Sequence, residues 1–477
     1  MKKHKISSLF LYRHRFGIGY TLLTLAFIAV IFLIPLLSPN GLSESEMQSA
    51  VDSASLSSES ILSGEIVDLP YHALQKVSAH FLGLSTYSIK LPSMIIGLFL
   101  GLLLILLLNR WFKNNVALIS SILTVLSAPF LYLVGSGTPL IMLVFWPTLL
   151  LWLGSKIQGV KKPRASFCFL FAFALLVSIF TPYMIYLAFF ILVYALIHPH
   201  LRYTIKTLPK APFIIASLIA LAGLGFVVYN MIKAPGTITG LLFSKDFKIE
   251  DFGGNLLAGF LPFFSWTGSV ESALLSPMLG LASVALAITG LISTAKGFFA
   301  SRNSIASLFI IFTVLLTGIN PDCAMLIILP FAILTAHGIR YILEKWYGLF
   351  PENPYARIFA IFPVGLFLGI LLFSSTFHYI FGYRYNPAVA NSFDSDLSLI
   401  YENVDENTAL LVTGGTLDYD FYHILNNKYP VITSPKDANG KAIASLGKGS
   451  NIPENYKLYR IITSPKSTNS DRIYIYK

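Results

Sequence analysis

The sequence predicts an all-α polytopic membrane protein of about 11 transmembrane helices, followed by a small extracytoplasmic α/β domain. Three observations favour this fold class. Of the 477 residues, 55% are hydrophobic and only 12% are charged, with a mean hydropathy of +0.70, whereas soluble domains carry about 25% charged residues. Apolar runs recur along the chain as far as residue 376. Beyond them, short β-rich runs alternate with polar helical stretches.

The apolar runs approach or reach the roughly 20 residues that a membrane-spanning helix needs. They cover residues 18–37, 90–108, 116–134, 139–155, 165–180, 183–198, 211–229, 274–294, 303–319, 322–341 and 357–376. The first run exceeds a typical signal-peptide core and lacks a clear cleavage site, so we interpret it as a retained anchor. The apolar stretch 255–268 contains Pro and Gly, which favours an interfacial or re-entrant segment.

The distribution of basic residues predicts the orientation. Lys and Arg are concentrated before the first run and in alternate connections after it, whereas acidic residues concentrate on the opposite side. By the positive-inside rule the N-terminus is cytoplasmic, and an odd number of spans places the C-terminal part outside a plasma membrane. This topology explains the net charge of +11. No basic run or basic–aromatic pattern suggests nucleic-acid binding.

We therefore divide the chain into a transmembrane domain, 1–376, with a long outer loop at 38–89, and a C-terminal domain, 377–477. In the loop, Ser43 and Glu46 have the spacing of a capping box, which predicts the start of a surface helix. A second amphipathic helix is predicted over 68–85, with Pro70 in its first turn.

Three acids of this loop are candidate catalytic groups, because a general base needs a carboxylate within reach of an acceptor hydroxyl. Glu44 and Glu46 stand at the start of the first predicted helix and are the leading candidates, whereas Asp68, at the start of the second, is a second-line base or ligand. The alternative is structural: Glu46 caps its own helix, and Glu44 complements the helix dipole. The loop sequence alone leaves both interpretations open.

The C-terminal domain shows the alternation of a small α/β fold. Helices are predicted over 393–404 and 419–427, and strands over 409–415, 430–434, 459–464 and 472–477. The glycines of "VTGGT" (412–416) follow a strand, and we interpret them as a strand-to-helix turn.

Several motifs resemble those of the GT-C membrane glycosyltransferases. The similarity is greatest to the branch that holds protein O-mannosyltransferases and bacterial aminoarabinose transferases. The motifs are "GLSESE" (41–46), "DLPYHALQK" (68–76), "KLPS" (90–93), the basic turn 109–115, "SAPF" (127–130) and "ILPFAILTAHGI" (328–339). Their order resembles the family over roughly residues 15–341, and the C-terminal domain is not covered.

The resemblance implies a hexosyl or pentosyl transferase that takes a sugar from a polyprenyl-phosphate carrier. The acceptor would be a glycan, a lipid or a protein at the outer face. The family's catalytic Asp–Glu pair aligns with Ser45 and Glu46, so the usual aspartate is a serine here, and Glu46 or Glu44 would supply the carboxylate.

The carrier phosphate needs a cation or a helix N-terminus. The outer-face candidates are Lys76, Lys90, Lys245 and Lys248, together with the helix expected to begin at Pro139. Snorkelling membrane anchors are the alternative role for the lysines. No tightly bound cofactor is expected and no metal-ligand cluster is visible, although a divalent cation is compatible with the reaction.

Three alternatives to an active transferase remain at this point. A catalytically degenerate protein of the same fold would bind the lipid-linked sugar or a partner without turnover. A lipid or solute transporter is the second, but the predicted spans carry few of the ionisable residues that transporters place near the bilayer midplane. The third is a structural membrane protein whose C-terminal α/β domain carries the function by binding.

Overall fold

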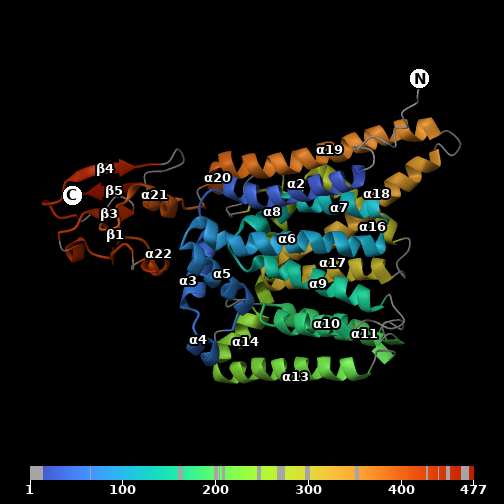
Figure 1. Ribbon diagram of the computed structural model, residues 1–477, viewed down its shortest axis with the longest axis horizontal. Helices are drawn as coiled ribbons and strands as arrows, with labels where there is room; N and C mark the ends of the chain where they lie inside the picture. Colours follow the sequence, from blue (N-terminus) through green and yellow to red (C-terminus); the bar gives the residue numbers. More distant parts are fainter. Residues whose placement is uncertain are drawn as a thin grey trace.

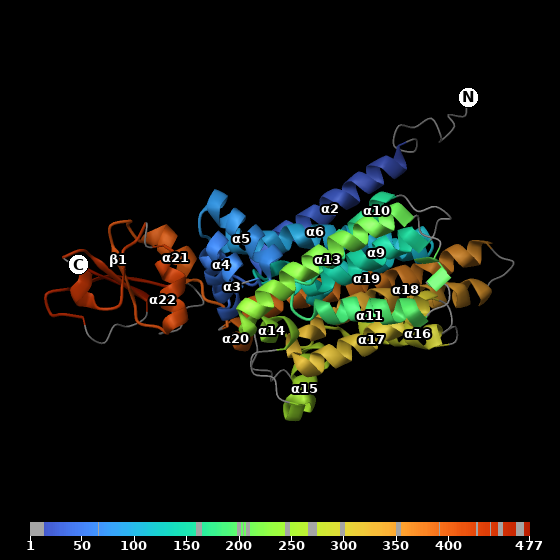
Figure 2. The ribbon, with the colours of Figure 1, turned by 90° about the horizontal axis from the view of Figure 1, so that it is seen from below.

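The computed structural model describes residues 14–477 except 65, 159–164, 198–201, 204, 207–209, 244–248, 266–273, 296–300, 350–353, 391, 426–427, 439, 447–451 and 464–471. Long helices run roughly side by side to form an elongated body, and a small sheet lies beyond one end (Figure 1). The short helices of the outer loop lie between the body and the sheet in both views (Figures 1 and 2).

The helical part follows the sequence prediction closely. In chain order it comprises α2 (Arg15–Leu37), α3 (Glu44–Ser55), α4 (Ser58–Ser63), α5 (Leu69–Leu82), α6 (Thr86–Trp111), α7 (Asn114–Val125), α8 (Ala128–Gly135), α9 (Leu140–Gln158), α10 (Ala165–Ser178), α11 (Met184–Ile197), α13 (Lys210–Lys233), α14 (Pro235–Leu242), η2 (Ile249–Asp251), α15 (Phe252–Phe264), α16 (Leu281–Ala295), α17 (Ser301–Ile319), η3 (Pro321–Ile327), α18 (Ile328–Leu349), α19 (Pro354–Tyr385) and α20 (Pro387–Ala390).

Each predicted span coincides with a helix or a pair of helices, but the number of membrane crossings is not confirmed. Within the described residues, five helices are long and apolar enough to cross a bilayer, or six if α7 and α8, bent by 60°, form one span. Other apolar helices, such as α10 and α11, are shorter. The protein is thus a multi-pass membrane protein whose exact span count stays a prediction.

Small residues allow two of these helices to approach closely. A Cβ at Gly290 of α16 would lie 1.9 Å from the carbonyl oxygen of Leu334, and one at Gly338 of α18 would lie 2.4 Å from that of Leu286. Close backbone approach at small residues is a usual way to pack helices in lipid, where no hydrophobic effect drives them together. The two glycines therefore fix the α16–α18 contact.

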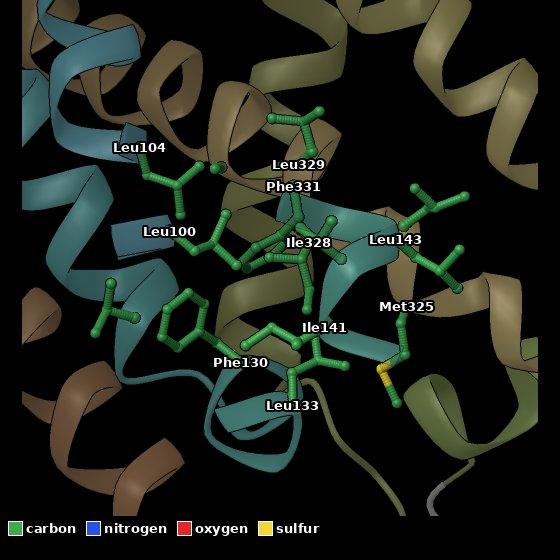
Figure 3. Packing of buried hydrophobic residues seen from close by; sticks show 14 of the residues in the cluster. Leu100, Leu104, Phe130, Leu133, Ile141, Leu143, Met325, Ile328, Leu329 and Phe331 are labelled. Carbon is green, nitrogen blue, oxygen red and sulfur yellow. The ribbon is translucent and has the colours of Figure 1, made fainter. Parts of the chain in front are cut away.

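The centre of the body is a large apolar cluster. Side chains from α6, α8, α9, η3 and α18 converge there, among them Leu100, Phe130, Ile141, Met325 and Ile328 (Figure 3). Ser120 of α7 adds a polar contact to α18 by hydrogen bonding, at 2.8 Å each, with Ala332 O and the Thr335 hydroxyl. The helices on either side of the outer loop, α2 and α6, are thus packed into this apolar cluster.

The C-terminal domain is a mixed sheet with two helices, as the alternating pattern predicted. Its elements are α21 (Asp396–Asn403), β1 (Ala409–Val412), α22 (Thr416–His423), β2 (Val431–Ile432), η4 (Pro435–Ala438), β3 (Ile443–Leu446), β4 (Leu458–Ile462) and β5 (Ile473–Tyr476). The strand order is β2-β1-β3-β5-β4, with β1 parallel to β2 and β3, and β5 antiparallel to β3 and β4. Strand β3 was not predicted.

The C-terminal domain is joined to the outer loop by packing and by a short β-bridge. Leu42 and Asp394 exchange backbone hydrogen bonds of 2.7 and 2.8 Å. Gly41 has φ +116°, and a Cβ there would lie 2.4 Å from Asp394 O, so only glycine fits. One apolar cluster includes Leu42, Met47 and Ala50 of the loop together with Phe421 and Leu410 of the domain. The loop and the domain therefore share a core.

Candidate functional site

Glu46 forms the capping box that the sequence predicted. The Ser43 hydroxyl accepts a 3.4 Å hydrogen bond from the Glu46 amide, and Glu46 Oε2 accepts a 2.8 Å bond from the Ser43 amide. The Glu46 residue is 0% exposed. This carboxylate is therefore held inside the fold and does not face solvent.

The second oxygen of Glu46 contacts a distant part of the chain. Glu46 Oε1 accepts a 2.6 Å hydrogen bond from the amide of Gly137, just before α9 begins. The predicted anion-binding helix start near Pro139 thus has the protein's own carboxylate as its partner. Gly137 also accepts a 2.9 Å hydrogen bond from Gln75, which ties α5 to the same point.

Lys90 pairs with this buried carboxylate. Its Nζ lies 3.7 Å from Glu46 Oε1 and donates to the carbonyl oxygens of Gly41, at 2.8 Å, and Pro39, at 3.2 Å. The Lys90 residue is 1% exposed, and its Nζ lies 6.0 Å from the ring centroid of Phe393. The ammonium thus donates two hydrogen bonds to backbone carbonyls and forms an ion pair with Glu46. Lys90 therefore holds the outer loop in place.

The other predicted cations lie elsewhere. Lys76 is exposed and donates to the carbonyl oxygens of Ala54, at 3.4 Å, and Leu56, so it links α5 to the end of α3. Lys245 and Lys248 lie outside the described residues, in the segment between Phe243 and Ile249. Glu44 is exposed in the first turn of α3, where a negative charge complements the helix dipole.

Asp68 stands apart from the Glu46 network, at the start of α5. Its backbone is left-handed, with φ 52° and ψ 22°, and its side chain makes no capping hydrogen bond. Its amide donates a 2.8 Å hydrogen bond to Phe180 O in the turn between α10 and α11. Among the described non-glycine residues, positive φ occurs only at Asp68 and at Tyr183 in that same turn. Such conformations concentrate at functional sites.

The surroundings of Asp68 change its acidity. Burial raises the pKa of this carboxyl from its ordinary value of 3.8 to about 8, and the negative charge of Asp52 on α3 contributes in the same direction. Burial also lowers the pKa of His72, one turn further along α5, and His72 Nδ1 is buried without a hydrogen-bond partner. A carboxyl with a pKa near neutrality can exchange a proton at physiological pH.

A third segment completes this region. The Asn320 side chain donates a 2.9 Å hydrogen bond to the Tyr183 hydroxyl and accepts a 2.9 Å bond from the Asp322 amide at the start of η3. Tyr183 interacts electrostatically with both Asp68 and Asp322. No sequence motif predicts a role for Tyr183 or Asn320, although "TPY" and "NPD" mark turns there.

The structure thus separates the five predicted site residues that it describes. It brings Glu46 and Lys90 together in a buried pair, keeps Asp68 in a second cluster, and leaves Glu44 and Lys76 on the surface. The hydroxyl of Tyr71 on α5 is within electrostatic range of both Glu46 and Asp68 and forms a 2.7 Å hydrogen bond with the Ser93 hydroxyl. Within the described part of the chain, no three His, Cys, Asp or Glu side chains are grouped as a metal site would require.

Comparison with solved structures identifies the fold. ArnT from Cupriavidus metallidurans, in its crystal structure bound to undecaprenyl phosphate, matches with a TM-score of 0.52 and 13% identity over 96% of this chain and 98% of that chain. Its apo structure matches with a TM-score of 0.53 at the same identity and coverage. No protein-family model matches the sequence, and no curated protein matches it. The chain therefore has the fold of ArnT over nearly its whole length, in agreement with the resemblance of its motifs.

Proposed function

We propose that this protein is a glycosyltransferase that moves a sugar from a polyprenyl-phosphate carrier to an acceptor at the outer face of the membrane. The observation that carries the proposal is the fold, which matches ArnT over nearly the whole of both chains. That protein was crystallised with undecaprenyl phosphate. The carboxyl of Asp68, which is set in a left-handed turn of the outer loop, gives the proposed reaction a base.

Asp68 is the preferred base because the other acids are less suited to the task. Both oxygens of Glu46 already accept backbone hydrogen bonds, and its side chain is buried. Glu44 is exposed to water on the surface of α3, where nothing desolvates the reacting groups. Asp68 is half-buried, has a raised pKa and lies in a left-handed turn that a tertiary hydrogen bond maintains.

The proposed reaction is a single inverting displacement. The acceptor hydroxyl oxygen attacks the anomeric carbon while the bond from that carbon to the phosphate oxygen breaks. The electron pair of the broken bond leaves with the polyprenyl phosphate, and the hydroxyl proton passes to the Asp68 carboxylate. General base catalysis of this kind contributes about 10²–10⁴-fold to a rate.

The leaving phosphate requires positive charge nearby. We assign this role to Lys245 and Lys248, which follow α14 in the sequence and lie outside the described residues. The end of α14 contacts the Asp68 region: Leu241 O accepts a 2.9 Å hydrogen bond from the Tyr183 amide, and Leu242 O accepts one of 2.9 Å from the Tyr186 hydroxyl. Lys90 and Glu46 act as positioning residues that hold the loop 38–43 and Gly137.

The test uses the full chain in lipid nanodiscs, with a panel of polyprenyl-phosphate-linked hexoses and pentoses carrying a labelled sugar. Release of polyprenyl phosphate is measured for the wild type and for Asp68→Asn, with Glu44→Gln as the matched control on the same loop. We expect one donor to turn over, Asp68→Asn to lose about 100-fold or more, and Glu44→Gln to remain active.

Other outcomes are equally informative. Loss of activity in Glu44→Gln with full activity in Asp68→Asn would identify Glu44 on α3 as the base. Saturable binding of polyprenyl phosphate without turnover of any donor would show a degenerate binding protein. Neither turnover nor binding would refute the proposed function as a whole.

A further inference from the structure

A cleft opens where the outer loop meets the C-terminal domain. We call it the loop–domain cleft; its volume is about 490 Å³, within the range of small-molecule sites. One wall comes from α3 and α5 and the other from α21 and the end of α22. The floor is apolar, formed by small and aliphatic side chains such as Ala50, Ala79 and Leu425. The cleft thus exists only because the two parts of the chain are docked together.

The charged groups that line the cleft are basic. Lys76 comes from α5 and Lys428 from the C-terminal domain. The side chains of His80 and Gln75 also carry nitrogen, and no acid is among the described residues of the lining. Lys76 uses donors on the carbonyl oxygens of Ala54 and Leu56, and an ammonium has three. Lys428 is paired at 3.1 Å with Glu406, which lies outside the lining. The cleft therefore favours an anion.

An aromatic ring stands beside the basic groups. Lys428 Nζ lies 4.9 Å from the ring centroid of Tyr401. Tyr401 also lines a second cavity of about 330 Å³, together with Lys90 and the start of α6. The half-buried Tyr401 is thus the shared wall of two cavities, and it offers the loop–domain cleft a flat apolar surface next to a cation.

We propose that the loop–domain cleft binds the acceptor and that the acceptor is an anionic oligosaccharide, an inference that rests on the proposed transferase function. Basic groups on opposite walls suit negative charge, and the Tyr401 ring with the apolar floor suits the faces of sugar rings. Lys76 lies eight residues from Asp68 along α5, which corresponds to about 12 Å. A single sugar held at Lys76 is too short to reach Asp68, so the acceptor has several.

The test measures binding to the full chain in nanodiscs of neutral lipid by isothermal titration calorimetry. The probe is a hyaluronan tetrasaccharide, which carries glucuronates, and the comparator is chitotetraose, which is neutral. Inorganic phosphate is a third arm, because it carries charge without a sugar. We expect saturable binding of the anionic tetrasaccharide alone, weakening as salt increases.

Variants assign the binding to the cleft. Lys428→Gln should weaken binding roughly tenfold, as expected for the loss of one charge-assisted hydrogen bond. Glu406→Gln should strengthen it, because it releases Lys428 from its ion pair. Lys441→Gln is the matched control, since Lys441 is an exposed lysine of the same domain outside the cleft lining, and it should leave affinity unchanged.

Equal binding of chitotetraose would overturn the anionic assignment, and equally tight binding of inorganic phosphate would overturn the carbohydrate assignment. Equal losses in Lys428→Gln and Lys441→Gln would place the ligand elsewhere. Failure of the transferase function is recognised separately: the tetrasaccharide would still bind at the cleft while no donor turned over.

Discussion

The buried pair of Glu46 and Lys90 gives a quantitative prediction of stability. Lys90→Met would remove the ammonium that lies 3.7 Å from Glu46 Oε1 and that donates to Gly41 O and Pro39 O. Glu46 and Lys90 are 0% and 1% exposed, so the remaining charge would stay inside the fold without its partner. Leaving one charge of a buried pair unpaired costs about 3–5 kcal/mol of unfolding free energy.

The double variant Glu46→Gln/Lys90→Met provides the decisive comparison. Each single variant leaves one buried charge without its partner, whereas the double variant leaves neither. We expect the double variant to cost less than the sum of the singles, with a coupling energy of about 2 kcal/mol. After the Glu46→Gln change, the Gly137 and Ser43 amides share a single amide oxygen as acceptor in place of two carboxylate oxygens, so some cost remains.

The assay is SDS-induced unfolding from mixed micelles, followed by tryptophan fluorescence. Arg340→Gln is the matched control, because it removes an exposed ion pair. Arg340 Nε lies 2.6 Å from Glu344 Oε1, and the two side chains are 39% and 60% exposed. Exposed pairs contribute about 0–1 kcal/mol to stability. A cost for Lys90→Met no larger than that for Arg340→Gln would refute the argument. Simple additivity in the double variant would refute the coupling.

Three further predictions follow from the site and the packing. Transferase activity should rise with pH as Asp68 loses its proton, with a midpoint near its pKa of about 8, and a profile flat from about pH 6 to 9.5 would contradict its role as base. Because the folded-state pKa of Asp68 exceeds the ordinary 3.8, the wild type loses stability as pH rises from about 4 to 8. The melting temperature of Asp68→Asn minus that of the wild type should therefore increase over this pH range. A constant difference would argue against a raised pKa. Gly338→Ala should lower the unfolding free energy by about 1–3 kcal/mol through overpacking, because its Cβ would lie 2.4 Å from Leu286 O. Gly348→Ala in the same helix is the control, because its Cβ would meet nothing within 4 Å. Equal SDS-unfolding midpoints for the two variants would contradict the close α16–α18 contact.

Local sequence signals predicted local structure well. The spacing of Ser43 and Glu46 predicted the start of α3, and apolar runs predicted a helix at every expected span. Strand β3 escaped prediction because "IASL" is short and contains small residues, although three of its four residues are buried. Its strand character comes from neighbours on both sides, which no local pattern reveals.

The site depends on contacts between segments that lie far apart in the sequence. Glu46 accepts from Gly137, 91 residues away, so its capping role was predictable but its burial was not. The raised pKa of Asp68 depends on its burial and on Asp52 of another helix, and its backbone is bonded to Phe180, more than 100 residues away. A list of candidate acids was thus available from the motifs, whereas choosing among them required the packing of distant segments.

The shared core of the outer loop and the C-terminal domain has a consequence for biogenesis. Leu42 and Met47 leave the ribosome long before Phe421 and the strands that complete their cluster. The loop therefore cannot complete its packing until the C-terminal domain has been synthesised and has folded. A chain truncated before this domain would keep its apolar helices yet leave the shared core open.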